Sequence, residues 1–199
     1  DFLESARLAF YAGFDAVEPH GAHNYLLNLF FSPNKNRRTD EYGGSIENRM
    51  RFACGIAEAV KQECGTMLLL YRHTPVGSGY GIEESLVLCG KLVEKGVDIL
   101  DISPASDQAP GDRAEPFRKL GVPVVAVNNM GYVERAVETL EQERADLIAV
   151  GRGLIADPEW PNKVREGRLD EIVECIDCNE KCFGNLRKQI PIECVQWTN

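Results

Sequence analysis

The chain has 199 residues, of which 44% are hydrophobic and 27% are charged, so its composition is that of an ordinary globular protein rather than a disordered, collagen-like or membrane-spanning one. This length fits one domain or part of one. The net charge of −9, from 31 acidic and 22 basic residues, disfavours binding to nucleic acid or to an anionic membrane surface.

The ends of the chain suggest where the protein resides and how complete it is. No stretch approaches the roughly 20 apolar residues of a membrane span, and the acidic, amphipathic opening differs from a signal sequence, so we expect a cytoplasmic protein. Because the chain starts at Asp1 inside a helical pattern, we also expect it to be a fragment.

Helical and apolar segments alternate along the chain. Helical spacing is found in residues 2–12, 45–64, 83–94 and 133–142. Apolar runs that predict buried strands are found in residues 14–20, 67–71, 97–103, 122–127 and 145–152. Short apolar strands separated by helices predict an α/β fold with a parallel sheet, either a doubly wound open sheet or an eight-stranded barrel.

Polar residues stand at the carboxyl ends of these strands, where both folds place their chemistry. They are His20, His23, Arg72, His73, Ser103, Asn128, Asn129, Gly151 and Arg152. The spacing of His20, His23 and Tyr25 places three groups capable of proton transfer in one loop. No G-x-G-x-x-G sequence follows a strand, which disfavours a dinucleotide-binding fold.

The segment HGAHNYLLNLFFSPNKNRRTDEYGGSIENR resembles the old yellow enzyme family, also called NADH:flavin oxidoreductases. The resemblance continues through YRHTP, ILDIS, VPVVAVNNM and IAVGRGLIADPEWPNKVREG. It implies a TIM (β/α)8 barrel of which about strands 4–8 are present. Residues 1–166 would form the C-terminal half of this FMN-binding barrel.

The resemblance also implies roles for individual residues. His20 and His23 would bind the carbonyl oxygen of an unsaturated substrate, and Tyr25 would protonate the substrate carbon. Arg72 would lie against the flavin ring, although a salt bridge to an acid on another strand is an alternative.

The FMN phosphate would be held after the last two strands. The resemblance assigns it to Gly151 and Arg152. The resemblance also places Asn128, Asn129 and Met130 at this phosphate, at positions where many family members have glycines. Pro158 can open the helix that follows Arg152, and Pro19 can shift His20 by removing a strand donor.

Four cysteines crowd the end of the chain, at Cys175, Cys178, Cys182 and Cys194. Four thiolates indicate zinc or an iron–sulfur cluster. The spacing resembles the branch with 2,4-dienoyl-CoA reductase and trimethylamine dehydrogenase, which implies a [4Fe–4S] cluster in residues 167–199. The remaining cysteines, Cys54, Cys64 and Cys89, lie on helical patterns and are expected in the core.

The resemblance therefore implies an FMN-dependent reductase of the C=C bond in α,β-unsaturated carbonyl compounds, such as enones or enoyl thioesters. Electrons from NAD(P)H would pass through the cluster, and FAD and NAD(P)H would bind a further module outside this chain. The alternatives are an amine dehydrogenase and a non-catalytic, zinc-stapled barrel. We expect a small-molecule substrate, neither nucleic acid nor membrane as partner, a possible homo-oligomer, and an inactive isolated fragment.

Overall fold

The computed structural model describes residues 1–104 and 113–197, which form two compact units. The first unit comprises Asp1–Val127 and Arg144–Leu147, and the second comprises Asn128–Glu143 and Ile148–Asn199. The predicted domain boundary after residue 166 stays a prediction.

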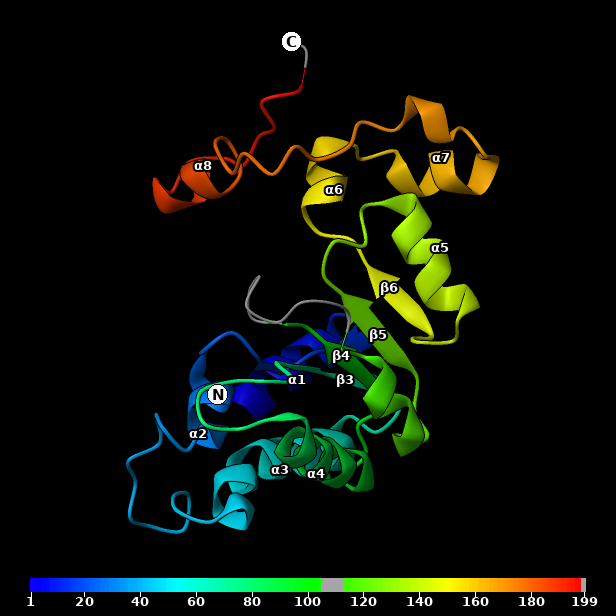
Figure 1. The fold of residues 1–199 in the computed structure, drawn as a ribbon. Coiled ribbons are helices and arrows are strands. Elements are labelled where there is room, and N and C mark those ends of the chain that lie inside the picture. The colour runs from blue at the N-terminus through cyan, green and yellow to red at the C-terminus, as the bar shows by residue number, and fades with distance from the viewer. Residues whose placement is uncertain (105–112, 198–199) are drawn as a thin grey trace. The chain divides into compact units, whose positions relative to one another are not determined.

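The first unit is built on a parallel sheet (Figure 1). Its strands are β1 (Ala16–Val17), β2 (His20–Gly21), β3 (Leu68–His73), β4 (Ile99–Ile102) and β5 (Val124–Val127). Their order is β1-β3-β4-β5, and β2 also pairs with β3. Parallel pairing was the prediction from the apolar runs, and it is confirmed.

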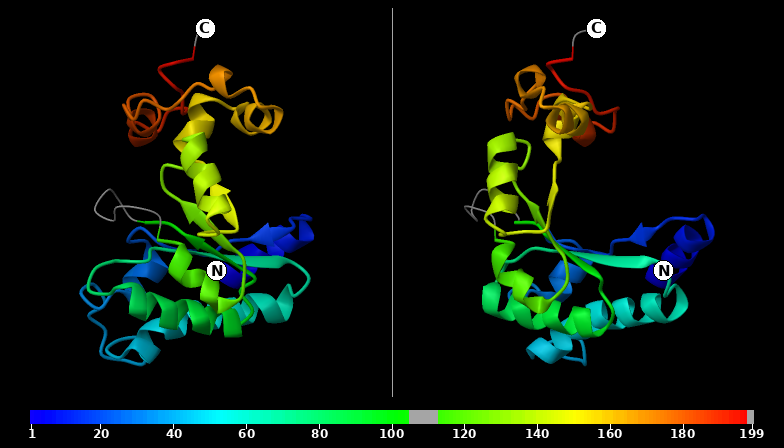
Figure 2. Two further views of the ribbon diagram at one scale, coloured as in Figure 1. Left: turned by 45° about the vertical axis from the view of Figure 1, so that its right-hand side comes forward. Right: turned by 90° about the vertical axis from the view of Figure 1, so that its right-hand side faces the viewer.

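In the described part of the first unit, four α-helices and one 3-10 helix accompany these strands. They are α1 (Phe2–Tyr11), α2 (Leu26–Phe31), α3 (Ile46–Glu63), α4 (Ile82–Glu94) and η1 (Glu115–Leu120). Figures 1 and 2 show α3 and α4 side by side along one face of the strands. The core between them includes Leu69, Leu88, Leu92 and Leu100, none of which is accessible to solvent beyond 1%.

Local sequence signals explain where the helices start and end. Ser45 caps α3 by accepting a hydrogen bond from the main-chain N–H of Asn48 at 3.3 Å. Gly13, just after α1, has a φ of 83°, a left-handed conformation that glycine adopts at little cost. The three cysteines expected in the core, Cys54, Cys64 and Cys89, are all buried.

The first predicted strand is interrupted. Residues 14–20 form two short strands, because Pro19 has no N–H to donate and Glu18 and Pro19 leave the ladder. Pairing resumes at His20, and the Pro19 carbonyl still accepts a hydrogen bond from the Arg72 N–H at 3.3 Å. The proline therefore divides the strand but leaves His20 in register with Arg72.

The second unit is mainly helical. Its elements are α5 (Val133–Glu141), α6 (Arg152–Ala156), α7 (Trp160–Glu166), η2 (Leu169–Glu171) and α8 (Phe183–Arg187). The last strand, β6 (Leu147–Ala149), begins at the final residue of the first unit. Helix α7 starts at Trp160 with Pro161 in its first turn, so the expectation that Pro158 opens the helix was wrong.

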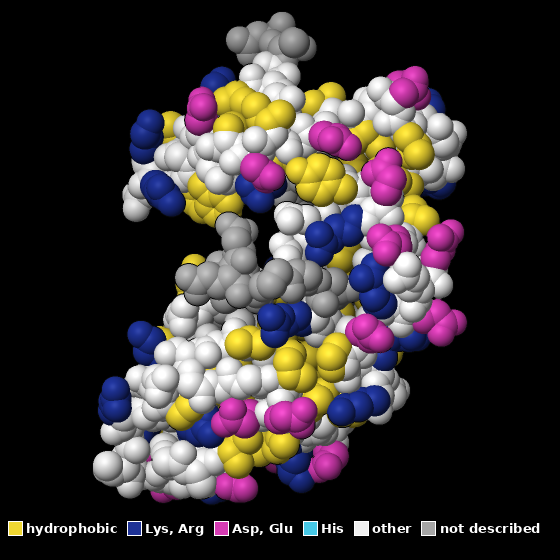
Figure 3. All heavy atoms as spheres, viewed as in Figure 1, with side chains coloured by type: hydrophobic (Ala, Val, Ile, Leu, Met, Phe, Trp, Pro, Cys, Tyr) yellow, Lys and Arg dark blue, Asp and Glu magenta, His cyan; other side chains and the backbone are white. Residues whose placement is uncertain are grey.

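Two hydrogen-bonded residues organise this unit. The Trp160 indole donates to the Gly131 carbonyl at 2.9 Å, and the Asp157 carboxylate pairs with Lys163 at 2.7 Å. On the face seen in Figure 3, acidic and basic side chains are interspersed among hydrophobic ones. Within residues 1–104 and 113–197, no helix is both long and apolar enough to cross a membrane.

Candidate active site and cysteine pocket

The register of the sheet brings polar residues of three strands together in the first unit. His20 of β2 is paired with Arg72 of β3, which is paired with Asp101 of β4. These residues lie near the carboxyl ends of their strands, where parallel α/β folds place their chemistry. The site therefore arises from strand pairing between segments that are far apart in the sequence.

The loop after β2 gathers the three residues of the predicted motif. The rings of His20 and His23 have centroids 5.4 Å apart, and those of His20 and Tyr25 are 5.0 Å apart. His23 and Asn24 have φ values of 56° and 61°, which turn the chain sharply. Tyr25 then precedes α2, and its side chain is 64% exposed, so the phenol is open to a ligand.

Hydrogen bonds hold this turn in place. The His23 N–H donates to the Thr74 hydroxyl at 3.0 Å, and the Asn24 N–H donates to the Asn28 side chain at 2.9 Å. The Asn28 amide in turn donates to the Tyr80 hydroxyl at 2.6 Å. Asn24 therefore keeps the left-handed geometry that this turn requires.

Arg72 and His23 share one hydroxyl group. Arg72 Nη2 donates to Ser103 Oγ at 3.1 Å, and His23 Nε2 lies 3.0 Å from the same oxygen. Arg72 Nε is 3.7 Å from Asp101 Oδ1, a separation that forms an ion pair without a hydrogen bond. The salt bridge considered as an alternative role for Arg72 therefore exists, but its geometry is loose.

The electrostatics favour neutral imidazoles at this site. Burial and the Arg72 charge lower the pKa of His20. Burial, Arg72 and His20 lower the pKa of His23, and hydrogen bonding to the backbone of Ser103 and Pro104 only partly opposes this. At neutral pH each ring therefore carries one N–H donor and one nitrogen acceptor.

The two acids near Arg72 do not fully neutralise it. Burial raises the pKa of Asp101 to about 7, an effect that Arg72 opposes and Glu18 reinforces. Burial likewise raises the pKa of Glu18. Asp101 is therefore only partly ionised at neutral pH, so the region around Arg72 stays attractive to an anion.

His73, which also stands at a strand end, lies outside this cluster. Its side chain is fully buried and its ring packs near Phe31, Tyr80 and Phe117. Its Nε2 is 2.9 Å from Ser85 Oγ, and burial lowers its pKa to about 3. Adjacent strand residues face opposite sides of a sheet, so Arg72 and His73 cannot both face the site.

The residues assigned to the FMN phosphate lie in the second unit. Asn128 and Asn129 have φ values of 105° and 58°, so the chain turns in left-handed conformations there. Met130 is 1% exposed, so its side chain belongs to the core and does not contact a ligand. Arg152, which follows Gly151, is paired with Asp177 at 2.7 Å and with Asn179 at 3.0 Å.

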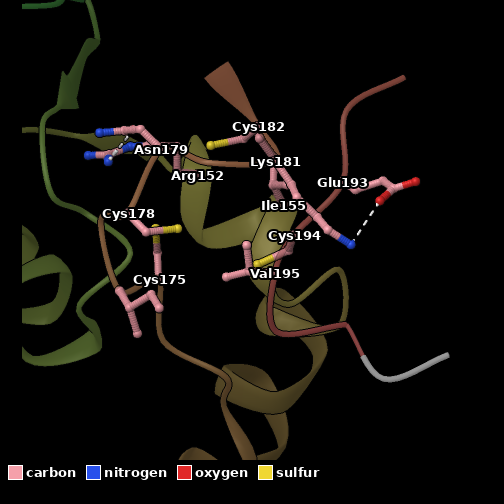
Figure 4. A pocket seen from close by; sticks show the side chains of 11 residues that line it. Arg152, Ile155, Cys175, Cys178, Asn179, Lys181, Cys182, Glu193, Cys194 and Val195 are labelled. Atoms are coloured by element: carbon pink, nitrogen blue, oxygen red, sulfur yellow. Dashed lines mark hydrogen bonds and ion pairs between the residues drawn. The ribbon is translucent and has the colours of Figure 1, made fainter. Parts of the chain in front are cut away.

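The four C-terminal cysteines line one pocket of the second unit. Figure 4 shows their sulfur atoms around a common space, with Arg152 and Ile155 also in the lining. All four are free thiols. In the part of the chain that the structure describes, no three His, Cys, Asp or Glu side chains are grouped as ligands of one metal ion.

Two participants were not assigned roles from the sequence. Ser103 was noted only as a strand-end residue, and Asp101 sits in the apolar run of residues 97–103. Both face the same side of β4 because side chains two positions apart on a strand share a face. The position of Asp101 within an apolar strand was a sequence signal for a functional residue. Its pairing with Arg72 could not be predicted, because that pairing depends on the register between β3 and β4.

Comparison with known proteins gives a consistent family assignment. The profile of the NADH:flavin oxidoreductase / NADH oxidase family matches residues 1–171. An NADH oxidase of Thermoanaerobacter brockii is 39% identical over 92% of the chain, which spans 31% of that protein. A cinnamate reductase of Clostridium sporogenes is 32% identical over 97% of the chain, which spans 34% of that protein.

Solved structures agree. A 2-naphthoyl-CoA reductase matches with a TM-score of 0.89 at 28% identity, covering 98% of this chain and 33% of that one. Histamine dehydrogenase from Rhizobium sp. 4-9 matches with a TM-score of 0.86 at 30% identity, and the match covers 98% of this chain and 31% of the dehydrogenase. Morphinone reductase matches with a TM-score of 0.73 at 34% identity, and the match covers 83% of this chain and 47% of the reductase.

The chain thus spans about a third of the length of the first two of these relatives. It carries part of a TIM barrel, as the resemblance implied. The extent of the profile match, together with the strand-end cluster of His20, His23 and Arg72, leads to one conclusion: the chain belongs to the NADH:flavin oxidoreductase / NADH oxidase family.

Proposed function

We propose that this chain supplies the substrate-binding half of an FMN-dependent reductase that acts on the C=C bond of α,β-unsaturated carbonyl compounds. The observation that carries the proposal is the cluster of His20, His23, Tyr25 and Arg72 at one end of the sheet. Bound FMN would supply hydride chemistry to the substrate. The chain's own residues would bind the carbonyl, balance charge and supply a proton.

The two histidines suit a carbonyl oxygen. Because their pKa values are lowered, each neutral ring can donate one N–H hydrogen bond. Two such donors would polarise the carbonyl and stabilise negative charge that develops on its oxygen. Tyr25, exposed beside His20, would donate its phenolic proton to the substrate carbon.

Arg72 fits the neighbourhood of a flavin ring. Its Nε is buried without a hydrogen bond, and its partner Asp101 is only partly ionised at neutral pH. A cation with unused donors can hold an electron-rich ring edge and favour its anionic form. These observations support Arg72 as a flavin contact rather than a purely structural ion pair.

The phosphate assignment needs one rearrangement. Arg152 can meet a phosphate only if the anion replaces or joins Asp177, which now occupies its guanidinium. The main-chain N–H groups of Asn128, Asn129, Met130 and Gly151 would supply the remaining donors. We therefore propose main-chain contacts as the primary phosphate interaction and Arg152 as a secondary one.

We propose that Cys175, Cys178, Cys182 and Cys194 hold a [4Fe–4S] cluster that relays electrons from NAD(P)H. The support is a set of four free thiols around one pocket. In a cubane each thiolate binds a different iron, so the four sulfurs lie farther apart than the ligands of one zinc ion.

A second candidate is an amine dehydrogenase. The similarity to histamine dehydrogenase over 98% of this chain favours it. A cationic amine would be held by aromatic faces, and Tyr25 is the exposed tyrosine of the His20–His23–Tyr25 cluster. Reduction is preferred because two neutral histidine donors and a nearby cation suit an oxygen anion better than an ammonium group.

The test uses the full-length protein purified without oxygen. A visible spectrum with iron, sulfide and zinc analysis identifies the bound groups, and oxidation of NADH is then followed with cinnamate and with 2-cyclohexenone. We expect flavin, iron and sulfide, together with turnover of at least one of these acceptors. Zinc without sulfide would refute the relay, and reduction of the flavin by histamine but no reduction of either acceptor would favour the dehydrogenase.

A further inference from the structure

The first unit contains two serine–histidine pairs with similar distances and different surroundings. Ser103 Oγ lies 3.0 Å from His23 Nε2 at the candidate site. Ser85 Oγ lies 2.9 Å from His73 Nε2 in the core. A serine hydroxyl has one proton to donate and two lone pairs that accept, so the third partner of each oxygen constrains the direction of its hydrogen bond to the histidine.

The third partner at Ser85 is an acceptor. Ser85 Oγ is 2.8 Å from the Pro75 carbonyl, which can only accept, so the hydroxyl proton points there. Ser85 must then accept a hydrogen bond from His73 Nε2–H. This pair is built for a histidine that carries its proton on Nε2.

The third partner at Ser103 is a donor. Arg72 Nη2 is 3.1 Å away, and a guanidinium has donors only. One lone pair of Ser103 Oγ is thereby occupied, and its own proton is available to His23 Nε2. The second lone pair can still accept from the histidine, but Ser103 is only 3% exposed, and donation to Nε2 gives its buried hydroxyl proton an acceptor. This favours a direction that is the reverse of that at Ser85.

We propose that Ser103 is a positioning residue that receives a hydrogen bond from Arg72 and donates one to His23, so that His23 keeps its proton on Nδ1. The Nδ1–H is then the single donor of the ring, and a ligand oxygen competes for it with the backbone of Ser103 and Pro104, which also hydrogen-bonds His23. Ser103 also ties the cation of β3 to the histidine loop, because one hydroxyl contacts both. That a ligand oxygen meets Nδ1–H rests on the proposed function; the tautomer itself does not.

The charges around His23 agree with a neutral ring. Arg72 faces it from β3 and His20 from β2, and both lower its pKa. The acids Glu18 and Asp101 interact with Arg72, and burial raises the pKa of both. A neutral ring carries its proton on either Nδ1 or Nε2, and the hydrogen bond to Ser103 can determine which tautomer is populated.

The experiment is 15N NMR of the full-length protein labelled at histidine, because protonated and unprotonated ring nitrogens resonate in separate regions. His20, His23 and His73 are assigned by single substitution. We expect His23 to be protonated on Nδ1 and His73 on Nε2, opposite tautomers in one spectrum. A His23 protonated on Nε2 in the unsubstituted protein would overturn the proposal.

Three variants distinguish a specific effect of Ser103 on the His23 tautomer from a general perturbation of the fold. Ser103→Ala should turn the His23 signals into an average of the two tautomers, and Ser103→Thr, which keeps a hydroxyl, should restore the Nδ1 form. Ser85→Ala is the matched control and should leave His23 unchanged. An unaltered His23 tautomer in Ser103→Ala would refute the role of Ser103, whether or not the threonine variant folds.

Acetate serves as the probe for the oxygen site. Titration should shift the His20 and His23 signals, and Ser103→Ala should weaken acetate binding by about 2- to 10-fold, the range for one lost hydrogen bond. If saturating acetate leaves both histidines unshifted, the proposed oxygen site fails while the tautomer result still decides the role of Ser103.

Discussion

Two buried groups in this unit should make stability depend on pH in opposite directions. The pKa of His73 falls to about 3 in the folded protein, against about 6.5 for a free histidine. Below pH 6.5 the unfolded chain binds a proton that the folded chain refuses, so His73 removes stability as the pH falls. Asp101 does the reverse, because its folded pKa of about 7 exceeds the ordinary value of about 3.9.

The magnitudes follow from these shifts, since one pKa unit corresponds to about 1.4 kcal/mol. Between pH 7.5 and 5, His73 should cost about 2 kcal/mol of unfolding free energy, and Asp101 should contribute about 2.5 kcal/mol. The two nearly cancel. His73→Gln, which keeps an N–H donor for Ser85, should therefore gain about 2 kcal/mol on acidification relative to the unsubstituted protein, and Asp101→Asn should lose about 2.5.

The assay is urea unfolding at several pH values, followed by far-ultraviolet circular dichroism. Only the difference between each variant and the unsubstituted protein is used, so other titrating groups cancel. Asp101→Asn is the control for His73→Gln, because its effect has the opposite sign. Parallel stability curves for His73→Gln and the unsubstituted protein would refute the neutral, buried histidine.

Three further predictions concern separate parts of the chain. Tyr25→Phe should slow substrate reduction by about 100- to 10,000-fold and spare flavin reduction by NADH, and equal losses in the two stopped-flow half-reactions would exclude the proton-donor role. Cys178→Ala should lose iron and sulfide while flavin content falls much less, which anaerobic metal analysis would measure. Gly21→Ala should destabilise by about 1–3 kcal/mol in urea, because the added Cβ would overlap the buried Tyr71 ring, whereas Gly55→Ala, in open space on α3, should not destabilise.

Periodicity and capping predicted most of the elements of the first unit. The Ser45 cap and the apolar spacing gave α3 almost to the residue, since both signals are local. The break at Pro19 was foreseen only as a shift of His20, yet the outcome was two short strands with His20 still in register. A missing N–H is visible in the sequence, but whether neighbouring strands compensate for it is a property of the sheet.

Partners distant in the sequence were the part that could not be predicted. Arg152 was expected to hold a phosphate, and its pairing with Asp177 depends on how the segment after α7 folds back. His73 was grouped with Arg72 as a strand-end residue, although strand alternation alone places the two on opposite faces. The pairing of Arg152 with Asp177 depends on tertiary contacts, whereas the placement of His73 away from Arg72 follows from strand alternation in the sequence.

The arrangement of β4 explains why the site requires more than the histidine motif. Asp101 and Ser103 stand two residues apart and both contact Arg72, one at Nε and the other at Nη2. The hydrogen bond to Ser103 holds Nη2, and the looser ion pair with Asp101 restrains the Nε side, so rotation of the guanidinium is limited. Because Ser103 also contacts His23, a change at Asp101 or at Ser103, which directly follows β4, should affect the flavin side and the substrate side of the site together. Loss of only one of these functions in a β4 variant would show that Arg72 and the histidine loop are held independently.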